Sequence, residues 1–132
     1  MKSNFDTQFK TDEHFETDGI WIEYPNKAQI KIRRFGGSNS QKVRAIASAN
    51  FKPYSRQIEM GTLDEKIDKK ITITTFVKGC VVDWKNVIID DVETPYSEEA
   101  AIALFISLPE LYEHLLKESQ KLDNFKVSLG ND

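Results

Sequence analysis

The sequence has few of the residues that build disulfide frameworks and metal sites. Its 132 residues include one cysteine, Cys80, and two histidines, His14 and His114. A single thiol cannot form an internal disulfide, and one cysteine with two distant histidines does not supply the ligands of an ordinary structural zinc site. Disulfide-stapled and zinc-finger classes are therefore excluded, and we expect no metal ion and no cofactor.

Long hydrophobic runs are also absent. No apolar stretch approaches the roughly 20 residues of a transmembrane helix, and residues 1–10, MKSNFDTQFK, lack the apolar core of a signal peptide. We therefore expect a protein that enters no membrane and stays in the compartment where it is made. With 39% hydrophobic and 30% charged residues, the chain suits one domain with its own core.

The pattern of residues 20–33 predicts a β-hairpin. The apolar run Ile20–Ile22 precedes the turn residues Pro25 and Asn26, and the following residues alternate so that Ile30 and Ile32 share one face. Periodic apolar residues downstream predict about four helices. The expected fold is α+β, mainly α: an N-terminal β-hairpin followed by about four helices in a single compact domain, residues 19–132.

Capping residues and prolines predict where these helices begin and end. Ser38 or Asn39 is expected to cap the first helix, which should end before Pro53, and Thr62 has the capping-box spacing for the second. Residues 71–77 are β-branched and could form a strand, but the four-residue apolar spacing that leads into them favours a helix. The last two helices have similar signals at Ser97, an N-cap residue, and Pro109, which suits a first helical position.

The usual carriers of catalysis are missing. His14 and His114 are interpreted as surface residues, and Cys80 lies in an apolar stretch, where burial raises a thiol's pKa. The glycine-containing segment 36–42 lacks the second glycine of a phosphate loop, and the acidic turn at 90–93 lacks the ligand spacing of a calcium loop. We therefore expect no catalytic residues, no metal site and no enzyme activity.

Charge is distributed unevenly along the chain. The net charge is −3, but residues 1–60 carry 10 basic and 7 acidic side chains, whereas residues 61–132 carry 8 and 14. Between Lys27 and Arg56 there are eight basic residues and no acidic one. This segment could bind nucleic acid, although an overall acidic protein is a poor nonspecific binder. It could equally face an acidic protein or simply balance the acidic half of the same molecule. The candidate partner-binding residues are Arg33, Arg34, Lys42 and Arg44.

Residues 1–18 are expected to form a flexible acidic arm. The segment has no sustained hydrophobic period and is followed by Gly19. Spaced aromatic residues in a disordered arm can fold against a partner. Phe5 and Phe9 are therefore further candidates for partner binding.

Several short segments follow one another in a distinctive order. The chain reads GIWI at 19–22, AQIKIRR at 28–34, VVDWKNV at 81–87, PYSEEA at 95–100 and LPEL at 108–111, with Asn39 opening a helix in between. This ordered set, over about residues 19–125, resembles the tail assembly chaperones of long-tailed bacteriophages. One departure is the stretch after Trp84, which lacks the glycine expected in its turn.

The resemblance implies a small, non-catalytic, mainly helical protein of siphophage tail morphogenesis. It would bind the tape-measure protein, keep that protein soluble and help recruit tail-tube protein subunits. Its partners could include a longer frameshifted form of itself, produced near residues 128–132, and further copies of the chain. The implied location is the host cell cytoplasm, with no place in the mature virion. The alternative is a small nucleic-acid-binding or regulatory phage protein that uses the basic 27–56 segment.

Overall fold

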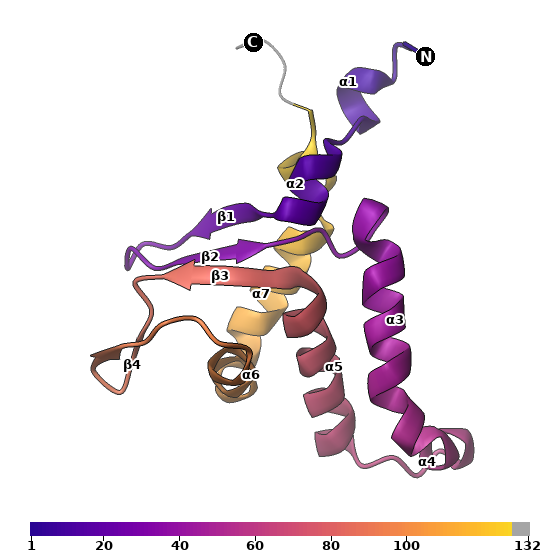
Figure 1. Ribbon diagram of the computed structural model, residues 1–132, viewed down its shortest axis with the longest axis vertical. Helices are drawn as coiled ribbons and strands as arrows, with labels where there is room; N and C mark the ends of the chain where they lie inside the picture. Colours follow the sequence, from indigo (N-terminus) through magenta and orange to yellow (C-terminus); the bar gives the residue numbers. More distant parts are fainter. Residues whose placement is uncertain (128–132) are drawn as a thin grey trace.

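The computed structural model describes residues 1–127, which form a three-stranded antiparallel sheet with helices packed against one face (Figure 1). The strands are β1 (Ile20–Glu23), β2 (Gln29–Ile32), β3 (Val81–Lys85), β4 (Ile88–Ile89) and β5 (Val92–Glu93). The helices are α1 (Asp6–Phe9), α2 (Glu13–Asp18), α3 (Ser40–Phe51), α4 (Ser55–Met60), α5 (Glu65–Cys80), α6 (Glu98–Ser107) and α7 (Pro109–Gln120), with the short 3-10 helices η1 (Gly37–Asn39), η2 (Lys52–Tyr54) and η3 (Leu122–Phe125). The α+β class, mainly α, is confirmed.

The β-hairpin predicted for residues 20–33 is formed by β1 and β2. Its register places Ile22 opposite Ile30, so apolar side chains of both strands share the face that the helices cover. β3 extends the sheet to the order β1-β2-β3 and places Trp84 opposite Ile30. The sequence analysis missed β3 because this strand follows α5 directly, without a turn signal between them.

Two helices are capped differently from the prediction. Asp64 rather than Thr62 caps α5, because the Asp64 carboxylate accepts a 2.8 Å hydrogen bond from a backbone N–H of the first turn. Neither Ser38 nor Asn39 caps α3 through its side chain. The Asn39 amide is buried and donates 3.0 Å hydrogen bonds to the backbone oxygens of Arg34 and Gly79. It therefore joins the end of the hairpin to α5.

The other predicted helix boundaries are confirmed. Residues 71–77 are helical within α5, and α3 ends before Pro53. Ser97 caps α6 by accepting a 3.1 Å hydrogen bond from a backbone N–H, and Pro109 is the first residue of α7. Beyond α3 the chain continues as η2 and α4, which the sequence analysis did not identify.

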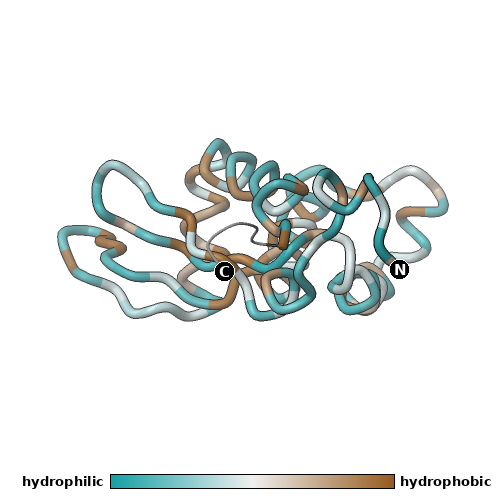
Figure 2. Tube along the Cα trace, turned by 90° about the horizontal axis from the view of Figure 1, so that it is seen from above, coloured by the Kyte–Doolittle hydropathy of each residue, from teal (hydrophilic) through white to brown (hydrophobic). Residues whose placement is uncertain are grey.

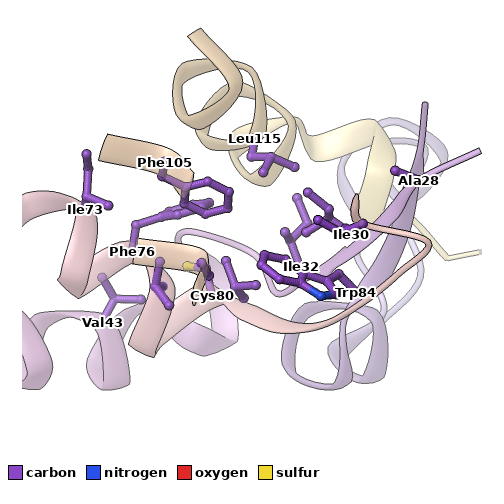
Figure 3. Packing of buried hydrophobic residues seen from close by; sticks show 14 residues of the cluster. Ala28, Ile30, Ile32, Val43, Ile73, Phe76, Cys80, Trp84, Phe105 and Leu115 are labelled. Atoms are coloured by element: carbon purple, nitrogen blue, oxygen red, sulfur yellow. The ribbon is translucent and has the colours of Figure 1, made fainter. Parts of the chain in front are cut away.

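The hydrophobic core lies where the sheet meets α5, α6 and α7 (Figure 3). Phe76 of α5 and Phe105 of α6 have ring centroids 6.4 Å apart, and Leu115 of α7 is fully buried. Trp84 is 4% exposed, and its indole N–H donates a 2.8 Å hydrogen bond to the backbone oxygen of Thr94. This bond holds the β4–β5 hairpin against the sheet.

Helices α1 and α2 precede the hairpin, in the segment expected to be a flexible arm. The prediction that the hairpin comes first is therefore corrected. The backbone N–H of Asp12 donates a 2.7 Å hydrogen bond to the oxygen of Phe125, and Thr11 forms a β-bridge with Lys126. The pairing residues are more than a hundred positions apart, so local sequence patterns could not indicate that this segment is folded against the end of the chain. Residues 128–132, where the frameshift was expected, lie outside the described residues.

No helix within residues 1–127 is both long and apolar enough to span a bilayer. The tip of the β1–β2 hairpin and the β4–β5 hairpin project from one side of the molecule, and α4 lies at the opposite side (Figures 1 and 2). The hairpins and α4 thus present two separate surfaces of the molecule.

Candidate functional site

Two of the four basic candidates make contacts within the protein. The Arg34 guanidinium forms an ion pair with Glu16, whose carboxylate also accepts a 2.7 Å hydrogen bond from Ser38. The Arg33 Nε donates a 2.6 Å hydrogen bond to the backbone oxygen of Thr17. Both arginines thus hold α2 against the end of the hairpin, and they present less free charge to a partner than the sequence suggested.

The Glu16 carboxyl group is held in its charged form. Burial raises the pKa of Glu16, but the hydrogen bonds from Arg34 and Ser38, together with the positive charge of Arg34, lower it by more. The pKa therefore lies below its ordinary value of 4.5. Gly37 lines the same site with a φ of +52°, and an added Cβ would collide with the Glu16 carboxylate. We call Glu16, Arg34 and Ser38 the Glu16 cluster.

The remaining two basic candidates, Lys42 and Arg44, are exposed on α3. They flank the buried Val43, so they point about 200° apart around the helix axis. Lys31 lies on the outer face of the sheet, with its ammonium 5.9 Å from the centre of the Trp21 ring. The basic residues of the 27–56 segment are therefore spread from the hairpin to α4, and those on α3 point in different directions.

Phe5 and Phe9 form an exposed aromatic pair on α1. Their side chains are 59% and 60% exposed, and their ring centroids are 6.3 Å apart. The two rings are therefore accessible to a partner.

The histidines and the cysteine show no catalytic arrangement among residues 1–127. Cys80 is fully buried, and burial raises the pKa of its thiol to about 12. His114 is exposed, as predicted, and its Nδ1 lies 2.8 Å from the hydroxyl of Tyr24. No cluster of three potential metal-ligating side chains occurs in this part of the chain.

An apolar groove opens beside the projecting hairpins. It has a volume of about 250 Å³ and lies between the tip of β1–β2, the start of β4, and the junction of α6 with α7. The residues that line it are Tyr24, Asn26, Ala28, Ile30, Asn86, Val87, Ile88, Leu104, Leu108 and Leu111. We refer to these residues as the apolar groove.

Local structure explains why apolar side chains are exposed in this groove. Ile88 is 66% exposed because its strand, β4, pairs only with the two-residue strand β5 and extends beyond the sheet. Leu108 is 50% exposed because it ends α6, and Pro109 then starts α7 in a new direction. Because Ile88 and Leu108 line one apolar groove, the groove is a candidate interaction site.

The chemistry of the groove favours binding. Tyr24 is the only titratable residue that lines it, and burial, together with the negative charge of Glu118, raises the pKa of Tyr24 to about 12. The phenol therefore stays protonated at neutral pH. The surface offers apolar contact with amide and hydroxyl groups at its edge, as binding grooves for helices do.

The sequence analysis did not identify this groove. Its lining residues come from three separated segments, and only the tertiary structure brings them together. One local signal was available: Ile88 and Ile89 stand between turn residues, where a two-residue strand cannot bury both of them. The expected acidic turn is confirmed as Asp90–Asp91, with positive φ at both residues in place of the expected glycine.

Comparison with known proteins identifies the chain as phage-derived. The family model described as "YdaY prophage protein" matches residues 38–130, which is more than half of the chain. The family description does not specify a tail assembly chaperone. No curated protein and no solved structure matches the chain.

Proposed function

We propose that this chain, which belongs to the YdaY prophage protein family, is a phage tail assembly chaperone. In this role it binds the tape-measure protein, keeps that protein soluble and helps recruit tail-tube subunits. The observation that carries the proposal is the apolar groove, where the side chains of Ile88 and Leu108 remain exposed. The protein acts in the host cytoplasm by binding alone, and it is absent from the mature virion.

The dimensions of the groove suit side chains of another protein better than a free ligand. Its volume of about 250 Å³ lies below the roughly 300–1,000 Å³ of typical small-molecule pockets. An amphipathic helix places apolar side chains at positions i, i+3, i+4 and i+7, and a shallow apolar groove can receive such a stripe. Tape-measure proteins are expected to be long helical chains with apolar surface, so covering that surface would limit their self-association.

Nucleic-acid binding has weaker support than protein binding. It requires basic side chains that follow a phosphate backbone, with aromatic rings accessible for stacking. In this protein Arg33 and Arg34 contact α2, and Lys42 and Arg44 point in different directions from α3. We therefore favour a protein partner.

Co-expression with the cognate tape-measure protein tests the proposed function. We expect the soluble fraction of the tape-measure protein to rise and the two proteins to co-purify, because groove contacts cover apolar helical surface. Replacing both Ile88 and Leu108 by Asn should remove most of this effect while the domain stays folded, since both side chains are exposed.

The matched control is the replacement of Ile58 and Met60 by Asn. These two apolar residues of α4 are 45% and 65% exposed and lie on the opposite side of the molecule. This control variant should protect the tape-measure protein as well as the original chain does. Circular dichroism verifies that both variants fold. An unchanged soluble fraction without co-purification would rule out the proposed function.

A further inference from the structure

The apolar groove is bordered by acidic side chains. Glu93 of β5 lies directly opposite Ile88 of β4 in the antiparallel register, so the two side chains share one face of this hairpin. The turn that joins the two strands consists of Asp90 and Asp91, and both are exposed. Across the groove, the exposed Glu110 directly precedes the lining residue Leu111 in the first turn of α7. We call these four acids the acidic rim.

The four acids of the acidic rim form no ion pair within the described residues. Every ion pair of residues 1–127 lies elsewhere, and none includes Asp90, Asp91, Glu93 or Glu110. Two lysines adjoin lining residues in the sequence. Lys85 lines a neighbouring hollow together with Glu93 and holds its ammonium 4.3 Å from the centre of the Trp21 ring, and Lys27 lies at the hairpin tip. The four carboxylates of the rim outnumber these two cations. The rim is therefore negative overall.

From this combination we infer that the groove selects a basic amphipathic helix, one whose apolar stripe is flanked by lysine and arginine. The inference rests on the proposed function and specifies the partner segment that it would bind. Apolar side chains of the helix fill the space beside Ile88, Leu104 and Leu108. Its cations meet the carboxylates of the acidic rim, which form no ion pair within residues 1–127.

The charges act mainly on selectivity and on the rate of association. Exposed ion pairs add little affinity each, but several carboxylates around one groove attract a basic helix and repel an acidic helix with the same apolar residues. Screening by salt weakens both effects. The preference between two helices of opposite charge should therefore be large at low salt and reduced near physiological ionic strength.

Two synthetic helices test this directly. Both carry leucine at i, i+3, i+4 and i+7; one has lysine at the flanking positions, and the other has glutamate. We expect the lysine peptide to bind the full chain about tenfold or more tightly than the glutamate peptide at low salt, measured by fluorescence anisotropy.

The hairpin variant D90N/D91N/E93Q should remove most of that preference. Asparagine tolerates the left-handed backbone of residues 90 and 91, so this variant is expected to fold. The matched control E59Q/E65Q/D68N neutralises three exposed acids near α4, and it should bind both peptides as the original chain does. Equal binding of the two peptides by the original chain would overturn the inference, as would an equal loss in the control variant.

Parallel measurements separate this inference from the proposed function. If the chain solubilises the tape-measure protein but shows no preference for the lysine peptide, the proposed function stands and the acidic rim plays no part in selection. If the preference is found but the tape-measure protein stays insoluble, the groove chemistry stands and the proposed function fails. Self-association that is detected by size-exclusion chromatography and lost in D90N/D91N/E93Q would assign the groove to a second copy instead, overturning the inference.

Discussion

The two ends of this molecule use charged residues in opposite ways. At the N-terminal end, the buried Glu16 carboxylate is satisfied by Arg34 and Ser38 within the same chain. At the groove end, carboxylates such as Asp90 and Asp91 are exposed and form no ion pair within residues 1–127. The first set holds the fold together, whereas the second is available to a partner. The role of a charge thus depends on where the fold places its counter-charge.

The comparison changes the interpretation of the basic 27–56 segment. In the sequence this segment predicted one basic surface. In the structure, Arg34 pairs with Glu16 of the expected arm, and Arg33 donates a hydrogen bond to the backbone of Thr17. Lys42 and Arg44 remain exposed. Substitutions at Arg33 and Arg34 should therefore have different consequences from substitutions at Lys42 and Arg44.

The largest effect is expected from Glu16→Gln at the N-terminal end. The substitution leaves the Arg34 guanidinium, whose side chain is only 20% exposed, without a counter-charge. We expect the free energy of unfolding to fall by about 3 kcal/mol, as measured by urea denaturation. Glu13→Gln on the same helix is the control, because Glu13 is exposed, and it should change stability by less than about 0.5 kcal/mol.

A smaller loss of stability is expected when the pH is lowered for the protein with Glu16 in place. The pKa of Glu16 is lowered in the folded state, so its contribution to stability is fully present above about pH 4.5 and is lost as the pH falls toward the lowered pKa. The stability difference between the original chain and Glu16→Gln should therefore shrink below pH 4.5. Glu118, whose pKa is lowered by its hydrogen bond from Lys121, is present in both proteins and cancels. A difference that stayed constant down to pH 3 would contradict this assignment.

The smallest effect on stability is expected from reversing Lys42 and Arg44 to Glu. Both side chains are exposed on α3 and form no ion pair within the described residues, so unfolding should shift by less than about 0.5 kcal/mol. Reversing Arg33 and Arg34 should instead destabilise the protein markedly, because a carboxylate would then face Glu16. The stabilities of the two double variants are compared by thermal unfolding. Similar losses of stability in both would contradict the distinction between charges that are paired within the chain and charges that are exposed.

The parts of the fold that could be predicted are those whose structure is determined by residues close together in the sequence. The alternation around Ile30 determined the hairpin, and the signals at Ser97 and Pro109 determined where α6 and α7 begin. Asn39 stands at the N-cap position of α3, as predicted, but its side chain bonds to Gly79, 40 positions away, and makes no capping bond. A capping residue and a buried cross-link have the same identity in the sequence, and only the presence of a distant acceptor distinguishes them.

The candidate site was less predictable than the fold for the same reason. In the sequence, Ile88 and Leu108 resemble ordinary core residues. They are exposed because β4 extends beyond the sheet and α6 ends at Leu108. By itself, the sequence determined the helices α3, α5, α6 and α7, the hairpin, and the excess of acidic residues in its second half, since these follow from local periodicity and composition. Tertiary structure decided that Arg34 pairs with Glu16, while the acids near Ile88 form no ion pair within residues 1–127. Coulomb attraction acts over distances in space, and those distances are set by how the chain folds.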